Sequence, residues 1–207
     1  MGRIEPAGPQ TIVEEHFSMP DREDGPMTLS VKSTYLAGDA DRMRWRLKTK
    51  SLSDLSDQYL DYFGNYYPGI TVAAPVSYVD ERDGNRLVVS EKYEISKAAL
   101  DKDDLIKDFP LHADFSLSDL PSPRVEGRRL PVDIGRAFVQ RHVVRVSNLK
   151  EEYTARLQED ISGEILNLRT YFLNGPSFIE FTFEYKKQKR VVPITEIQEL
   201  LDVKKKA

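Results

Sequence analysis

Apolar and polar side chains alternate along several segments of the chain, which is typical of β-strands with one buried face. The clearest case is residues 27–36, where Met27, Leu29 and Val31 share one face and polar residues fill most of the other. Similar patterns predict strands over 11–19, 70–79, 86–95, 138–146, 165–172 and 178–185, with a weaker one over 109–117. The turn sequences at 83–85 and 173–176 predict hairpins between the strands that they separate.

A different spacing predicts an early helical segment over about 39–63. Apolar residues recur three or four positions apart from Met43 to Phe63, and Asp39 is suited to cap the helix. Ser51 or Ser53 could restart the helix after a kink. A strand over 42–50 with a basic outer face is the alternative, but helix is favoured because the apolar spacing continues beyond this stretch.

The chain ends with a second predicted helix, over about 193–203. It begins at Pro193, and Ile197, Leu200 and Leu201 share one face. Residues 204–207 form a basic tail whose lysines suit the negative end of the helix. Residues 1–9 are predicted to be a tail or linker, since they hold Gly and Pro without periodicity.

These elements predict an α+β, β-rich fold: an antiparallel sheet or a β-sandwich with one early helical segment and a short C-terminal helix. Residues 10–203 are predicted to form a single domain. The alternative is a division near 97–108, where the chain is charged and order is least certain.

The composition of the chain excludes several classes of function. The 207 residues carry a formal net charge of −4, which gives no general attraction to nucleic acid or anionic membranes. The absence of cysteine excludes disulfides, thiolate nucleophiles and cysteine-ligated metals. No apolar run approaches the roughly 20 residues that span a bilayer, and residues 1–10 lack the apolar core of a signal peptide. The compartment is not predicted.

No catalytic, metal or cofactor site is predicted. His16, His112 and His142 each lie in a predicted strand, away from any glycine-flanked serine, and His142 among its valines suits a core position. The acidic stretch 101–104 lacks the glycine and the closing glutamate of a calcium loop. The sequence contains no glycine-rich phosphate-binding pattern.

An interaction surface is the best candidate for function. The candidate residues are Trp45, Tyr62, Tyr66 and Tyr67. Tyr67, just ahead of Pro68, is expected to be the most exposed of the tyrosines, whereas helical spacing makes a core role more frequent for the others. The basic run 42–50 around Trp45 has the parts of a single-strand nucleic-acid platform, but aspartates bracket it, so a solvated helix face is favoured and no nucleic-acid partner is predicted.

Three segments carry a family resemblance. They are 29–35 followed by Ala40-Asp41-Arg42-Met43-Arg44, then Tyr59-Leu60-Asp61-Tyr62-Phe63 with Tyr66-Tyr67-Pro68-Gly69-Ile70, and Leu87-Val88-Val89-Ser90-Glu91-Lys92-Tyr93. In this order they resemble the region that follows the catalytic core in bacterial proteins joining a domain of unknown function to a transglutaminase-like cysteine protease core. The resemblance covers residues 10 to about 203, and its specific part is confined to 27–95.

The resemblance implies a non-catalytic accessory domain that packs on the preceding transglutaminase-like core of the same polypeptide, in a parent protein that is exported to the periplasm or beyond. No catalytic residue of the family carries over, since this chain has no cysteine. The alternative hypothesis is a peptide- or glycan-binding β-module that acts through the aromatic segment near Tyr66 and Tyr67. A free-standing enzyme is the least favoured interpretation.

Overall fold

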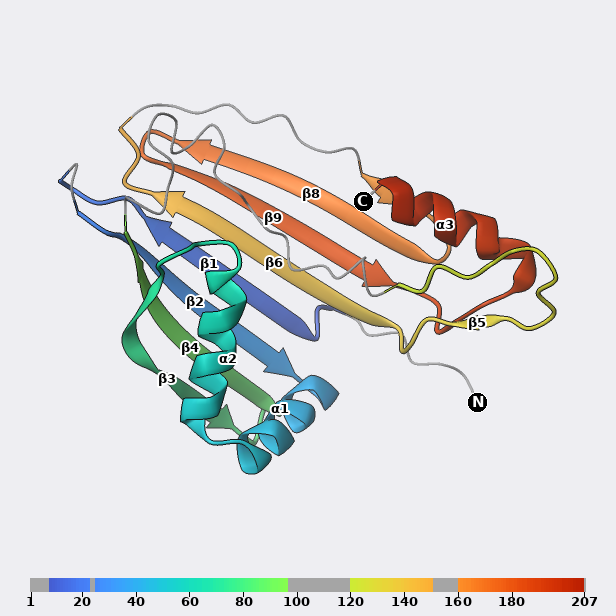
Figure 1. Ribbon diagram of the computed structural model, residues 1–207, viewed down its shortest axis with the longest axis horizontal. Helices are drawn as coiled ribbons and strands as arrows, with labels where there is room; N and C mark the ends of the chain where they lie inside the picture. Colours follow the sequence, from blue (N-terminus) through green and yellow to red (C-terminus); the bar gives the residue numbers. More distant parts are fainter. Residues whose placement is uncertain (1–7, 23–24, 97–119, 151–159, 207) are drawn as a thin grey trace.

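The computed structural model describes residues 8–22, 25–96, 120–150 and 160–206. Eight strands form one sheet in the order β3-β4-β2-β1-β6-β9-β8-β7 (Figure 1). The strands are β1 (Thr11–Ser18), β2 (Met27–Leu36), β3 (Thr71–Glu81), β4 (Arg86–Ile95), β6 (Phe138–Ser147), β7 (Ile161–Ser162), β8 (Leu166–Gly175) and β9 (Phe178–Lys187). The expected α+β, β-rich fold is confirmed, and among the described residues its large sheet is single rather than a sandwich.

Seven of the eight strands in this sheet are expected from the sequence pattern, but the order of the strands is not. All neighbours pair antiparallel except β1 and β6, which run parallel at the centre of the sheet. A long-range parallel pair leaves no local turn signal in the sequence. The second hairpin is confirmed, but its turn is shorter than the expected 173–176, because β8 continues to Gly175 and β9 begins at Phe178, which leaves only residues 176–177 in the turn.

Two helices follow β2: α1 (Gly38–Thr49) and α2 (Leu52–Gly64). The break between them confirms the expected restart at Ser51, whose hydroxyl accepts from the Asp54 amide while the Asp54 carboxylate accepts from the Ser51 amide. Asp39 is not the cap of α1. The helix begins one residue earlier, and the Asp39 carboxylate binds other side chains.

The C-terminal elements form a second, smaller layer. β5 (Val132–Asp133) pairs with β10 (Val191–Val192), and the 3-10 helix η3 (Ile194–Glu196) leads into α3 (Ile197–Lys206). The helix therefore includes Lys204–Lys206 of the expected basic tail. Ile197 and Leu200 are fully buried in one cluster with Leu166 and Tyr185 of the sheet.

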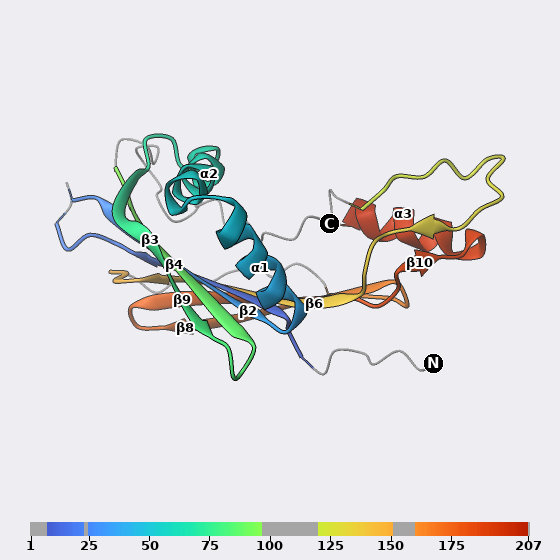
Figure 2. The same cartoon turned by 90° about the horizontal axis from the view of Figure 1, so that it is seen from below.

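All three helices lie on the same side of the sheet (Figure 2). The face under α1 and α2 supplies two further apolar clusters. One holds Phe17, Leu29 and Tyr93 with Phe63 of α2, and the other holds Leu55, Leu87 and Val89 with Met43 of α1. Opposed ion pairs such as Arg141–Glu184 and Lys32–Glu14 occupy the other face. The possible division near 97–108, the weak strand 109–117 and most of the tail 1–9 lie outside the described residues.

Candidate functional site

A cavity of about 450 Å³ lies between α2 and the sheet. We call it the carboxylate cavity, because two glutamates line it. Its lining residues are Thr11, Val13, Glu15, Val31, Ser33, Tyr35, Arg46, Gln58, Tyr59, Tyr62, Phe63, Glu91 and Gln140. They come from β1, β2, β4 and β6 below and from α1 and α2 above, so only the folded arrangement of helices over sheet creates this space.

The two glutamates stand on adjacent parts of the sheet because of strand register. Glu15 of β1 pairs with Val31 of β2, and Val31 pairs in turn with Glu91 of β4. Each glutamate occupies an inward position of an alternating strand, where its neighbours two residues away are apolar. Glu15 and Glu91 are therefore each only 6% exposed. A buried carboxylate is costly unless charge or hydrogen bonds compensate it.

The surroundings of Glu91 favour its neutral form. Burial raises the pKa of Glu91 from 4.5 to about 7, and the nearby charge of Glu15 raises it too. The Tyr93 hydroxyl donates a hydrogen bond to Glu91 Oε2 over 2.6 Å, and this bond and Arg46 act in the opposite direction. At neutral pH the carboxyl is consequently divided between its neutral and ionised forms, which is a property of groups that bind or move protons.

Glu15 is held beside a buried histidine. Nε2 of His142, on β6, lies 3.2 Å from Oε1 of Glu15, and His142 is completely buried. The core position expected for His142 is confirmed. On the other side, Tyr67 is near enough that Glu15 contributes to raising the pKa of its phenol, after the larger effect of burial. Glu15 thus has a polar and an aromatic neighbour in the interior of the protein.

Aromatic rings and one guanidinium form the upper wall of the cavity. The Arg46 guanidinium lies 5.4 Å from the centre of the Tyr59 ring and donates to Gln58 Oε1 over 3.0 Å. Burial raises the pKa values of Tyr35 and Tyr59, so both phenols stay neutral at physiological pH. Arg46 is therefore held by α2 and by an aromatic face.

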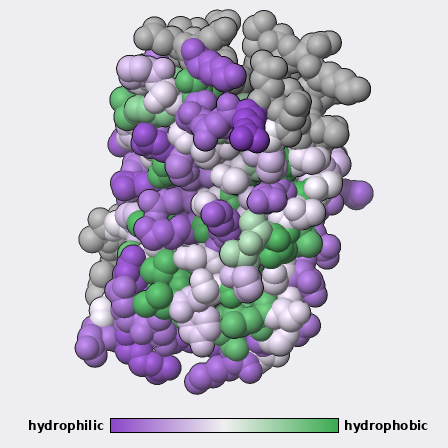
Figure 3. Space-filling model, turned by 90° about the vertical axis from the view of Figure 1, so that its left-hand side faces the viewer, coloured by the Kyte–Doolittle hydropathy of each residue, from purple (hydrophilic) through white to green (hydrophobic). Residues whose placement is uncertain are grey.

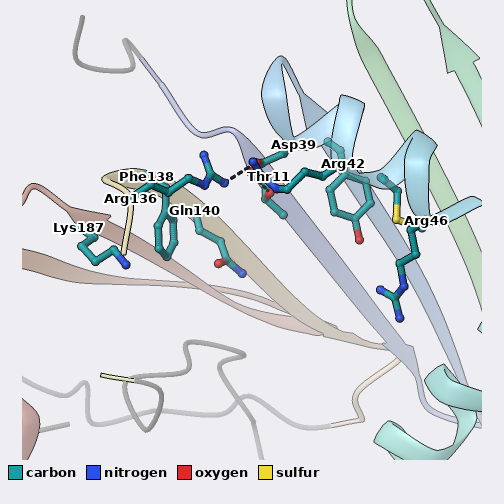
Figure 4. A pocket seen from close by; sticks show the side chains of 10 residues that line it. Thr11, Asp39, Arg42, Arg46, Arg136, Phe138, Gln140 and Lys187 are labelled. Atoms are coloured by element: carbon teal, nitrogen blue, oxygen red, sulfur yellow. Dashed lines mark hydrogen bonds and ion pairs between the residues drawn. The ribbon is translucent and has the colours of Figure 1, made fainter. Parts of the chain in front are cut away.

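A second cavity, of about 380 Å³, adjoins the first. We call it the arginine cavity (Figure 4). Its lining residues are Thr11, Tyr35, Asp39, Arg42, Met43, Arg46, Arg136, Phe138, Gln140 and Lys187. Asp39 is 7% exposed, pairs with Arg42 and Arg136, and accepts a hydrogen bond from Thr11 Oγ1 over 2.8 Å. The two cavities share four lining residues and lie one after the other along β1.

The four residues of the expected interaction surface do not form one surface. Trp45 of α1 is 67% exposed, whereas Tyr62 lines the carboxylate cavity. The Tyr66 ring packs edge-on against Tyr62 with centroids 5.3 Å apart. The expected exposure of Tyr67 is wrong: it is 2% exposed, and its ring packs on Phe17 at 5.6 Å. The residue after Tyr67 is a proline, but the tight turn directs the tyrosine inward.

The basic run 42–50 is helical as far as Thr49, so the strand alternative is wrong. Arg44 pairs with Asp41 and with Asp80 of β3 over 2.8 Å, and Lys50 donates to Gln58 over 2.9 Å. These contacts are typical of an ion-paired helix surface. The absence of a nucleic-acid partner stays a prediction.

Histidine and acidic side chains are the other candidates for chemistry in the sequence. In the described part of the chain, no group of three histidine, aspartate or glutamate side chains is placed to hold a metal ion. His16 is exposed on β1 and its Nε2 lies 2.7 Å from Ser147 Oγ. His112 and the acidic stretch 101–104 lie outside the described residues. Within the same residues, no helix is both long and apolar enough to cross a bilayer.

Comparison with known proteins adds no assignment. The chain matches no protein-family model and no curated protein.

No sequence motif marks Glu15 and Glu91, although the sequence carries a signal for both. Each is a charged residue on the apolar face of an alternating strand. Glu15 lies between Val13 and Phe17 on that face, and Glu91 between Val89 and Tyr93. Such a residue is directed into the core at a cost, which marks it for attention.

Proposed function

We propose that this protein is a binding module whose carboxylate cavity takes the ammonium group of a small organic ligand. The observation that carries the proposal is Glu91, a buried carboxyl in a cavity of about 450 Å³ with a pKa raised to about 7. A buried ionised carboxylate without full compensation destabilises a fold, so its position is best explained by a ligand that compensates it.

The chemistry of the cavity favours an ammonium over other groups. Glu15 and Glu91 supply two carboxylates, and Tyr35, Tyr59 and Tyr62 supply aromatic walls. Ammonium groups bind both to carboxylates and to the faces of aromatic rings. Arg46 does not fill this role, because the pKa of Glu91 stays near 7 in its presence.

The test is an NMR shift titration with n-butylammonium as the probe and n-butanol as the uncharged control of the same shape. We expect saturable shifts for residues of the cavity with the ammonium alone. Because protonation of Glu91 competes with the cation, binding at pH 5.5 should be up to about 30-fold weaker than at pH 8.

Two variants separate the site from the bulk charge of the protein. Glu91→Gln should weaken ammonium binding at pH 8 by about tenfold or more and remove most of the pH dependence. Glu94→Gln is the matched control, because Glu94 is on the same strand but exposed on the other face of the sheet. Equal binding of n-butanol, or an unchanged affinity in Glu91→Gln, would contradict the proposal.

A second candidate, the accessory domain on a transglutaminase-like core, is supported by one feature of the surface. Trp45 is 67% exposed on α1, and Leu52 at the start of α2 is 42% exposed. Exposed tryptophan is frequent where proteins bind one another. Figure 3, however, shows the apolar side chains of one end of the molecule in several small patches divided by hydrophilic ones.

The mass of the native gene product tests this second candidate. An antibody raised to this chain should detect a band far above 23.8 kDa if the chain is one part of a protease. A band near 23.8 kDa would contradict the accessory-domain hypothesis, and the binding module would then be the only one of the two candidates that stands.

A further inference from the structure

The arginine cavity has an excess of positive charge. Four basic side chains and one carboxylate, Asp39, line it. Figure 4 shows Arg136 and Lys187 on the side of β6 and β9 and Arg42 and Arg46 on the side of α1, with Thr11 and Gln140 between them. One carboxylate cannot neutralise four cations, so this cavity attracts anions.

Contacts within the fold hold Lys187 and Arg136, although the side chains of Arg136 and Arg42 also reach solvent, at 44% and 55% exposed. The Lys187 side chain is 8% exposed, its Nζ donates to the Ile134 carbonyl oxygen over 2.5 Å, and it lies 4.9 Å from the centre of the Phe138 ring. Arg136 lies over the same ring at 5.7 Å and pairs with Asp39. An anion entering the cavity would therefore meet donors that are already oriented.

The charges also repel one another. Burial lowers the pKa of Lys187, and the charge of Arg136 lowers it further. Burial and then the charge of Arg136 lower the pKa of Arg42 in the same way. A bound anion would relieve this repulsion, which is the converse of the situation in the carboxylate cavity.

We propose that the arginine cavity binds the carboxylate end of a short peptide whose amino end lies in the carboxylate cavity. This inference rests on the proposed function and extends it to the class of ligand.

The length of the ligand follows from β1. Thr11, which lines both cavities, and Glu15, which lines the carboxylate cavity, are four residues apart on the same strand, so a ligand that reaches from Glu15 to the arginine cavity spans at least about 13 Å. An extended peptide covers about 3.3–3.6 Å per residue, so a tetrapeptide with free termini places its two charges at this separation. The shared residues Arg46 and Gln140 lie between the two ends and offer hydrogen-bonding groups to the middle of the peptide.

The experiment is calorimetric titration of the unmodified protein with four probes. They are tetra-alanine with free termini, its N-acetylated form, its C-amidated form, and an aminoalkyl phosphate of similar length. We expect the free peptide to bind best, and each blocked form to bind at least tenfold more weakly because it loses one charge-assisted contact.

The outcomes separate the two proposals. If the amidated peptide binds as well as the free one while the acetylated form does not, the anion subsite is wrong and the ammonium site stands. If only the amidated form is weakened, the ammonium site is wrong and the arginine cavity is an anion site by itself. If none of the peptides binds, the assignment of a peptide ligand is wrong. If the aminoalkyl phosphate binds more tightly than the free peptide, the anion is a phosphate and not a carboxylate.

One variant pair adds a check on position. Arg136→Gln should weaken binding of the free peptide at least tenfold but leave binding of the amidated peptide almost unchanged, because the amidated peptide has no carboxylate for Arg136 to bind. Arg145→Gln is the matched control, because Arg145 lies on β6, the strand that begins two residues after Arg136, and pairs with Glu180 on the other face. Equal effects of the two variants would contradict the assignment of Arg136.

Discussion

The two ends of β1 are packed differently, although they belong to one strand and the residues compared share one face. At its end, Phe17 is completely buried and packs on Tyr67, within a cluster that includes Leu29 and Tyr93. At its beginning, Thr11 lines both cavities, and Glu15, further along the strand, lines the carboxylate cavity. The Phe17 end is filled by side chains and the Thr11 end is not. A close-packed end can therefore hold the strand while an open end exposes polar groups to a ligand.

The difference between the ends lies in how the helices cover the sheet. The last residues of α2 and the turn after it bring Phe63 and Tyr67 onto the Phe17 end, where rings fill the space. Over the Thr11 end the covering side chains include Arg46 and Gln58, which are long and polar, beside the ring of Tyr59. Polar side chains of this kind leave room between helix and sheet, because they bind one another instead of packing into the core.

Loss of the ring at the packed end should have the largest effect on stability. Phe17→Ala is expected to lower the free energy of unfolding by about 3–5 kcal/mol, because it leaves a cavity among residues that cannot all close around it. Urea unfolding measures the change. Leu173→Ala is the control, since Leu173 is 56% exposed and should cost under about 0.5 kcal/mol. A loss below 1 kcal/mol for Phe17→Ala would show that this end is not tightly packed.

At the open end, removal of a charge should stabilise the protein. The pKa of Glu91 in the folded state, about 7, exceeds its ordinary value of 4.5, so the folded protein binds more protons between these two pH values. Stability therefore falls as pH rises from about 4.5 to 7, and it stays low above pH 7. Glu91→Gln should therefore raise the free energy of unfolding by as much as about 3 kcal/mol at pH 8, and by little at pH 4.5.

Urea unfolding at several pH values checks this second expectation. Glu94→Gln should leave the pH dependence unchanged, because Glu94 is exposed. A Glu91→Gln variant with the same pH dependence as the unaltered protein would show that Glu91 is not responsible for it.

The smallest effect is expected from a hydroxyl. Tyr93→Phe removes the donor to Glu91 Oε2, which favours the ionised carboxylate, so the pKa of Glu91 should rise further. The free energy of unfolding of this variant should be lower by about 1 kcal/mol at pH 8 and by less at pH 4.5. Carboxyl carbon NMR of Glu91 measures the titration, with Tyr171→Phe, on an exposed ring, as the control. A lowered midpoint would exclude the hydrogen bond as a stabiliser of the charge.

Local patterns were sufficient for most elements. Alternation placed β2 and β4 at their observed boundaries, and of the two serines that could restart the helix, Ser51 and Ser53, Ser51 caps α2. These features depend on neighbours within a few residues, where spacing and capping act. Asp39 shows the limit of this reasoning: its position suited a cap, but tertiary contacts with Thr11, Arg42 and Arg136 determine where its carboxylate lies.

The candidate site could be predicted only in part. Alternation alone shows that Glu15 and Glu91 face inward, and helical spacing shows that Tyr59 and Tyr62 share a face. It does not show that the strands carrying the glutamates are separated by β2 alone, or that α2 crosses above them. Tyr67 was misjudged for the same reason, since its burial depends on Phe17, fifty residues earlier in the chain.

The sequence by itself determined that this protein is rich in β-strands, where most strands begin and end, and that cysteine chemistry is absent. Only the tertiary structure decided which strands are neighbours, including the parallel pair of β1 and β6, and so which polar groups share a cavity. The physical reason is that strand and helix periodicity arise from local backbone geometry. A binding cavity arises instead from side chains far apart in the chain, which come together once the sheet has a fixed order and the helices cover it.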